Sequence, residues 1–97
     1  MARFDVFTTD GPNCLLDCQA DILSRFKTRF VVPLLPAEGA ITATRLHPIF
    51  TVERRRMIMV TQLASAVPVA ELGRCIANLS DENHRIVNAI DMLLTGY

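Results

Sequence analysis

The hydrophobic pattern of this chain changes period once, and that change restricts the fold more than any other feature of the sequence. Between residues 3 and 62, apolar residues occur in short runs separated by turn residues, with alternation in the first run. From Ser80 onward they recur with a helical period. No segment has the spacing of a βαβ unit. The pattern therefore predicts a small α+β domain, in which an antiparallel sheet is followed by one C-terminal helix.

The expected strands form two hairpins with one further strand between them. The turn sequence Asp10-Gly11-Pro12-Asn13 closes the first hairpin, and Glu53-Arg54-Arg55 closes the second. Pro33 lacks a backbone N–H, so we expect it at a sheet edge or a bulge. The segment 36–44 is expected to be a loop. The predicted strands span residues 3–8 (with one buried face), 14–18, 30–35, 46–52 and 57–62.

The predicted helix spans residues 81–94. Ser80 is placed to cap the first backbone donors, and Gly96 is placed to end the helix. One apolar stripe is expected to pack on the sheet, and the opposite side is expected to face water or a partner. The stripe comprises Ile86, Val87, Ile90, Leu93 and Leu94, and the opposite side Asn88, Asp91, Met92 and Thr95.

Length and composition limit the class of protein. With 97 residues, the chain is expected to form a single domain over residues 1–97. No apolar run is long enough to span a membrane, and charged residues interrupt the first twenty positions, so we expect a cytoplasmic protein. The formal net charge of +0 disfavours a nucleic-acid binder held by phosphate contacts. An apolar fraction of 51% in so small a chain favours a homodimer.

No arrangement of residues in the sequence predicts catalysis, a metal site or a cofactor. His47 and His84 belong to no catalytic motif. Cys14, Cys18 and Cys75 have no zinc-site spacing and are interpreted as small buried hydrophobic residues. A protein-binding module is thus the interpretation that the residues favour.

The run Arg54-Arg55-Arg56 is the one strong charge cluster. A solvated hairpin tip, a contact with an acidic protein and a contact with nucleic acid are all compatible with it. Contact with an acidic protein is the functional interpretation of this run.

The order of short segments along nearly the whole chain resembles the CcdB family of toxins. No segment is distinctive by itself, and the resemblance lies in their order and spacing. The segments are Phe4-x-Val6, Asp17-x-Gln19-x-Asp21-Ile22-Leu23, Val31-Val32-Pro33-Leu34, Leu46-His47-Pro48, Met57-x-Met59-x-Thr61-x-x-Ala64-Ser65, Val67-Pro68-Val69, Leu79-Ser80 and Asn88-Ala89-Ile90-x-x-Leu93.

This resemblance implies an SH3-barrel-like antiparallel sheet with a C-terminal helix, shared with the MazF and Kid endoribonucleases. It also implies a homodimeric toxin of a type II toxin–antitoxin system that is not an enzyme. Such toxins bind the DNA gyrase A subunit and trap its complex with cleaved DNA. A CcdA-like antitoxin neutralises them.

The resemblance also implies which residues contact gyrase. The family grips gyrase with a Trp-Gly-Ile type tail, and these positions are Thr95, Gly96 and Tyr97 here. Gly96 matches, whereas the chain contains no Trp. The other implied contact residues are Ile22, Leu23, Ser80 and Asp91. Core packing of Ile22 and Leu23 and helix capping by Ser80 are the structural alternatives.

Three functions follow from these observations. The first is a gyrase-poisoning toxin. The second is a CcdB-fold protein with altered or lost gyrase activity that still binds an antitoxin, because Thr95 replaces the family's Trp. The third is an endoribonuclease, for which His47 is the candidate base.

Overall fold

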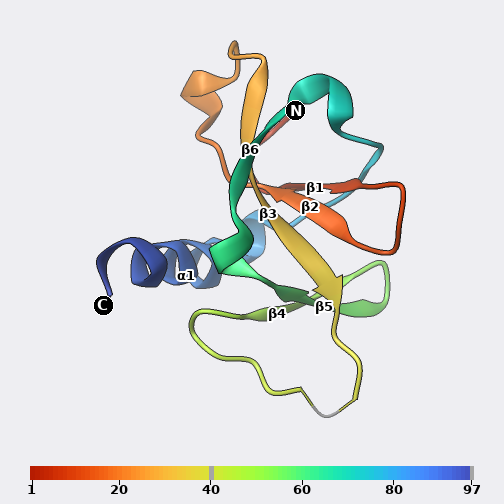
Figure 1. Ribbon diagram of the computed structural model, residues 1–97, viewed down its shortest axis with the longest axis vertical. Helices are drawn as coiled ribbons and strands as arrows, with labels where there is room; N and C mark the ends of the chain where they lie inside the picture. Colours follow the sequence, from red (N-terminus) through yellow and green to blue (C-terminus); the bar gives the residue numbers. More distant parts are fainter. Residues whose placement is uncertain (40, 97) are drawn as a thin grey trace.

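The computed structural model describes residues 1–39 and 41–96, and it shows a curled antiparallel sheet, a half-barrel, with one C-terminal helix (Figure 1). The strand order is β4-β5-β3-β2-β1-β7, and β6 pairs with β3. The predicted fold class is confirmed. The strands are β1 (Asp5–Thr8), β2 (Cys14–Asp17), β3 (Thr28–Pro36), β4 (Ile49–Val52), β5 (Arg55–Met59), β6 (Ser65–Pro68) and β7 (Cys75–Asn78). The helix is α1 (Asn83–Thr95), and the 3-10 turns are η1 (Asp21–Leu23), η2 (Thr61–Leu63), η3 (Val69–Glu71) and η4 (Ser80–Glu82).

The first hairpin forms as predicted, with Val6 opposite Leu16 and Thr8 opposite Cys14. β1 is shorter than expected because Phe4, with a φ of 70°, lies outside the extended region. The expectation of one buried face was wrong, since Val6 and Phe7 are both buried. Successive residues point to opposite sides of a strand, so both faces of β1 are covered.

β3 lies in the middle of the sheet, so the expectation that Pro33 marks an edge or a bulge was wrong. The Cys18 N–H donates to the Phe30 carbonyl at 2.8 Å. The backbone N–H and C=O groups of the even-numbered residues of β3 therefore point toward β2. The backbone groups of Pro33 therefore point to the other side of β3. On that side β6 pairs with β3 as far as Val31, and β5 pairs with it from Leu34 onward. Because Pro33 falls between these two partners, its missing N–H costs no sheet hydrogen bond.

The second hairpin has a tighter turn than predicted. Glu53 and Arg54 alone form it, with φ values of 49° and 69°, and Val52 pairs with Arg55. β4 begins at Ile49, after Pro48, and β5 ends at Met59 before η2. The longer expected strands were wrong because Pro48 cannot donate to a ladder and the chain turns into η2 at Thr61.

β6, β7 and η3 were not predicted. Each of the two strands has only four residues, and β6 ends in Pro68. Neither has an alternating apolar pattern that would mark it locally. They are strands because β6 pairs with β3 and β7 pairs with β1.

α1 packs its first half on the sheet and extends its last turn beyond it (Figure 1). Ile86 and Ala89 are fully buried, whereas Leu93 and Leu94 are 39% and 74% exposed. The expected burial of these two leucines was therefore wrong. The stripe is continuous in sequence, but the sheet ends before the helix does.

The two ends of α1 differ in how well the sequence predicted them. Ser80 makes no side-chain cap, because it begins η4, which precedes the helix. Its backbone N–H donates to Asn78 Oδ1 at 2.9 Å. Gly96 ends the helix as expected, with a φ of 77° and its N–H bonded to the Met92 carbonyl at 2.9 Å. In the described residues no helix is long and apolar enough to cross a bilayer.

A single apolar core joins the sheet to the helix. Arg85 strengthens this junction: its Nη2 donates to the Ile49 carbonyl at 2.8 Å, and its guanidinium lies 4.7 Å from the centre of the Phe50 ring. The core consists of Phe4, Val6, Cys14, Leu16, Cys18, Val32, Leu34, Phe50, Val52, Met57, Met59, Leu79, Ile86 and Ala89.

Candidate functional site

The free end of α1 presents an apolar surface to solvent. Met92, Leu93 and Leu94 are 36%, 39% and 74% exposed, and Thr95 and Gly96 follow directly. We call these five residues the helix-end surface. Apolar side chains gathered at one end of an element are typical of a protein-binding surface.

Three predicted gyrase-contact residues meet at this end of the helix. Asp91, Thr95 and Gly96 are all exposed, and Thr95 Oγ1 donates to the Asp91 carbonyl at 2.7 Å. The Thr95 hydroxyl thus bonds to its own helix. Tyr97 lies outside the described residues, so its predicted contact stays a prediction.

A second apolar surface surrounds η1. Ile22 is 87% exposed, Leu23 42% and Phe26 54%, and we call these three residues the η1 surface. The alternative that Ile22 and Leu23 pack in the core is therefore wrong. A groove of about 720 Å³ adjoins this surface, with Phe26 and Lys27 on one side and Pro68 and Val69 of β6 and η3 on the other.

Within one chain, the two surfaces do not meet. Figure 1 separates η1, at the top of the view, from the free end of α1. Ser80 lies at the opposite end of the helix, in η4. The predicted gyrase contacts thus lie in three separate places. These are the helix-end surface together with Asp91, the η1 surface, and Ser80.

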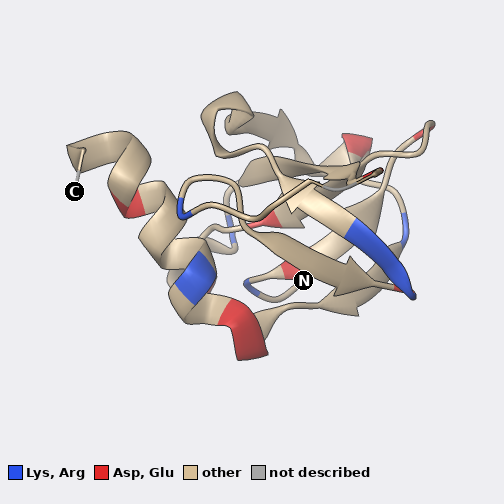
Figure 2. Cartoon of the chain, turned by 90° about the horizontal axis from the view of Figure 1, so that it is seen from below, with Lys and Arg blue, Asp and Glu red and all other residues tan. Residues whose placement is uncertain are grey.

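The arginine run lies along the β4–β5 hairpin, on the opposite side of the molecule from the helix end (Figure 2). Its three side chains have different surroundings. Arg56 Nη2 donates to the Ile41 carbonyl at 3.1 Å and so holds the loop between β3 and β4, whereas Arg55 Nη2 lies 4.0 Å from Cys14 Sγ. Arg54 lies in the turn itself and is exposed.

The residues considered for catalysis have different surroundings. His47 Nε2 is 2.6 Å from Gln62 Oε1, and His84 is exposed on α1. Residues 1–39 and 41–96 contain no cluster of three or more His, Cys, Asp or Glu residues that could hold a metal ion.

The cysteines have two different environments. Cys14 and Cys18 are buried and free, as expected, whereas Cys75 is exposed, contrary to expectation, because β7 has only one neighbouring strand. Burial, and next the nearby Asp17 carboxylate, raise the pKa of the Cys18 thiol to about 12, against the opposing charge of Arg3. The thiol is therefore protonated at neutral pH and is a poor nucleophile.

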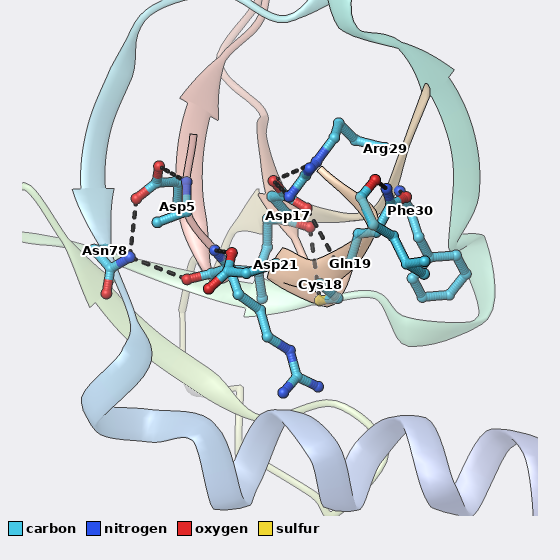
Figure 3. Close-up of polar contacts among 12 residues, drawn as sticks. Asp5, Asp17, Cys18, Gln19, Asp21, Arg29, Phe30 and Asn78 are labelled. Atoms are coloured by element: carbon cyan, nitrogen blue, oxygen red, sulfur yellow. Dashed lines mark hydrogen bonds and ion pairs between the residues drawn. The ribbon is translucent and has the colours of Figure 1, made fainter. Parts of the chain in front are cut away.

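A polar network under η1 was not predicted (Figure 3). Asp17 and Arg29 form a fully buried ion pair, in which Asp17 Oδ2 accepts from Arg29 Nε at 2.8 Å and lies 2.7 Å from Nη2. Asp17 Oδ1 accepts the Gln19 N–H at 3.0 Å. The two charges are 12 positions apart and show no local pattern, so sequence reasoning had no signal for their pairing.

The curled antiparallel sheet with one C-terminal helix is a CcdB/MazF-like fold. In the fold comparison, the Mycobacterium tuberculosis toxin MazF-mt6 matches with a TM-score of 0.71 over 93% of both chains, at 14% sequence identity. The model of the CcdB family, described as "CcdB protein", matches residues 3–96. The chain belongs to the CcdB family, and it is a toxin of a toxin–antitoxin pair.

Proposed function

We propose that this toxin binds the DNA gyrase A subunit through its helix-end surface and traps the gyrase complex with cleaved DNA. The observation that carries the proposal is the exposed end of α1, where Leu94 is 74% exposed and Gly96 ends the helix. A homodimer would present this end twice, so each favourable contact would count twice. The η1 surface supplies Ile22 and Leu23 as a second contact.

The antitoxin is proposed to be CcdA-like and to neutralise the toxin by binding it. Arg54 supports an acidic contact, because it is exposed at the hairpin turn and forms neither of the ion pairs of the described residues. Arg55 and Arg56 belong to the same proposed contact, although Arg56 also holds Ile41.

A second candidate function is a CcdB-fold toxin whose gyrase activity is altered or lost. The specific observation in its favour is Thr95, whose hydroxyl bonds to Asp91 of its own helix where the family places a stacking Trp. The resemblance implies that this Trp stacks on an arginine of gyrase, and such a cation–π contact contributes about 0.5–2 kcal/mol. A dimer without the Trp would lose this contribution at both tails.

A gyrase cleavage assay with purified protein separates these two functions. We expect the wild-type chain to cause cleaved DNA to accumulate, and Thr95→Trp to lower the concentration required about tenfold or more. Thr51→Trp is the matched control, because Thr51 is exposed on β4 and should leave the effect unchanged.

The three possible outcomes distinguish the functions. Activity of the wild type supports gyrase poisoning, and activity of Thr95→Trp alone supports the altered toxin. If the wild type and Thr95→Trp are both inactive at micromolar concentration, gyrase binding by this chain is contradicted.

We propose further that the toxin acts by binding and not by catalysis. The contact that the structure gives the His47 ring is the Gln62 amide oxygen, which is not an acid, a base or a cation. Incubation with a long RNA tests this proposal, and cleavage that copurifies with the protein would contradict it.

A further inference from the structure

The η1 surface lies outside the apolar core. Every residue from Asp21 to Thr28 is exposed, and Leu23 and Phe26 are only about half covered. A segment that buries no apolar side chain fully gains less of the free energy that normally offsets the loss of conformational entropy. Hydrogen bonds to the rest of the protein therefore contribute more to holding this turn in place.

One side chain joins both ends of the turn. Gln19 Nε2 donates to the Leu23 carbonyl at 3.0 Å, and Gln19 Oε1 accepts the Phe30 N–H at 3.0 Å. The first bond holds the end of η1, and the second holds the start of β3 (Figure 3).

The backbone of Gln19 is fixed in turn by the buried ion pair. Its N–H donates to Asp17 Oδ1, and the other carboxylate oxygen of Asp17 binds Arg29. Both charged side chains are at most 1% exposed, so their positions are tightly restrained. Gln19 thus connects a rigid buried pair to an exposed apolar turn.

The other tethers hold different parts of the segment. Asp21 Oδ1 accepts the Arg3 N–H at 2.8 Å, which holds the start of η1. The Val69 N–H donates to the Lys27 carbonyl at 2.8 Å, which holds the chain as it enters β3. At the end of η1, the Leu23 carbonyl also accepts the Phe26 N–H at 3.2 Å, within the segment itself, and Gln19 supplies the bond from outside the segment.

We propose that Gln19 is a positioning residue, which holds Ile22 and Leu23 in the conformation that contacts gyrase. The inference rests on the proposed gyrase contact of the η1 surface. A turn that is already ordered loses less conformational entropy when it binds. Gln19 would then affect affinity without touching gyrase itself.

Gln19→Glu tests this role, because it separates the two hydrogen bonds of the side chain. A carboxylate still accepts the Phe30 N–H, but it has no donor for the Leu23 carbonyl and repels that oxygen. Gln19→Ala removes both bonds. Gln62→Glu is the matched control, since Gln62 is an exposed glutamine in η2 whose described side-chain contact is His47.

The measurements are amide exchange at Phe30, the carbonyl chemical shift and backbone order of Leu23 by NMR, and affinity for the intact gyrase A subunit. For Gln19→Glu we expect wild-type exchange at Phe30, a shifted Leu23 carbonyl signal, a more mobile η1 and an affinity lower by about tenfold. For Gln19→Ala we expect the same loss of affinity together with faster exchange at Phe30. Gln62→Glu should leave the amide exchange of Phe30, the order and carbonyl shift of Leu23, and the affinity for gyrase unchanged.

Two results would overturn the inference. One is a Gln19→Glu variant in which Leu23 is as ordered as in the wild type. The other is a variant with a mobile η1 that binds gyrase with wild-type affinity. If the wild-type chain itself fails to bind gyrase, the proposed function fails. The order of Leu23 in Gln19→Glu then decides whether Gln19 holds the turn.

Discussion

Cys18 and Cys75 show how strongly the surroundings of one residue change its chemistry. Cys18 is 6% exposed, and burial together with Asp17 raises its pKa to about 12. Cys75 is exposed at the start of β7. Since a thiolate reacts and a thiol does not, the folded protein should have one accessible and reactive sulfur among these two.

Maleimide labelling of the folded protein at pH 7 to 8 should therefore modify Cys75 first. We expect one rapid addition per chain, with Cys14 and Cys18 reacting only when the protein unfolds. Mass spectrometry of the labelled protein gives the number and site of the additions. A rapid addition that persists in Cys75→Ser would contradict the burial of the other two thiols.

Among the elements, the β4–β5 hairpin contains local strain. Its two turn residues, Glu53 and Arg54, both have positive φ, which a two-residue hairpin of this type requires. A Cβ atom is crowded against the backbone carbonyl in this region, so Gly, which has no Cβ, and Asn, whose side chain can hydrogen-bond locally, normally occupy it. The turn therefore carries residues that are not the best suited to its backbone.

Replacement of Glu53 by Asn and Arg54 by Gly should stabilise the protein. We expect each substitution to raise the free energy of unfolding by about 0.5–1 kcal/mol, because the new residues adopt positive φ at lower cost. Urea unfolding measures the change, and Arg54→Ala, which keeps a Cβ, serves as the control. A gain as large in Arg54→Ala as in Arg54→Gly would show that charge, not backbone strain, is the cause.

In the whole molecule, the sheet covers only the first part of the helix. The last turn of α1 projects beyond the strands in both Figure 1 and Figure 2. Met92, Leu93 and Leu94 are left exposed on a chain of 10.8 kDa, which is small for so much exposed apolar area. A second copy related by a two-fold axis could cover Met92 and Leu93 on both chains and leave Leu94, Thr95 and Gly96 exposed for the proposed gyrase contact.

A homodimer that uses Met92 and Leu93 should dissociate when Met92 becomes charged. We expect the wild type to sediment as a dimer at tens of micromolar, and Met92→Asp to sediment as a monomer with unchanged helix content. His84→Asp is the control, because His84 is exposed near the other end of the same helix. A wild-type monomer at that concentration, or a dimeric Met92→Asp, would contradict this interface.

Sequence alone determined the features that depend on neighbours within a few residues. The turn residues before Cys14 and the alternation around Val6 predicted the first hairpin, the helical period predicted α1, and Gly96 predicted its end. These signals are local because turn geometry and helix periodicity act between residues close along the chain. The order of segments along the chain also identified the CcdB family. Recognising that order requires no knowledge of contacts between distant residues.

Tertiary structure decided what depends on pairing between distant segments. β7 is a strand only beside β1, and Pro33 is tolerated only because two partner strands stop on either side of it. The exposure of Ile22 and Leu94, and hence both candidate binding surfaces, depends on where the sheet ends in space. The same holds for Gln19, whose position next to Leu23 and Phe30 follows from the way the chain folds back on itself.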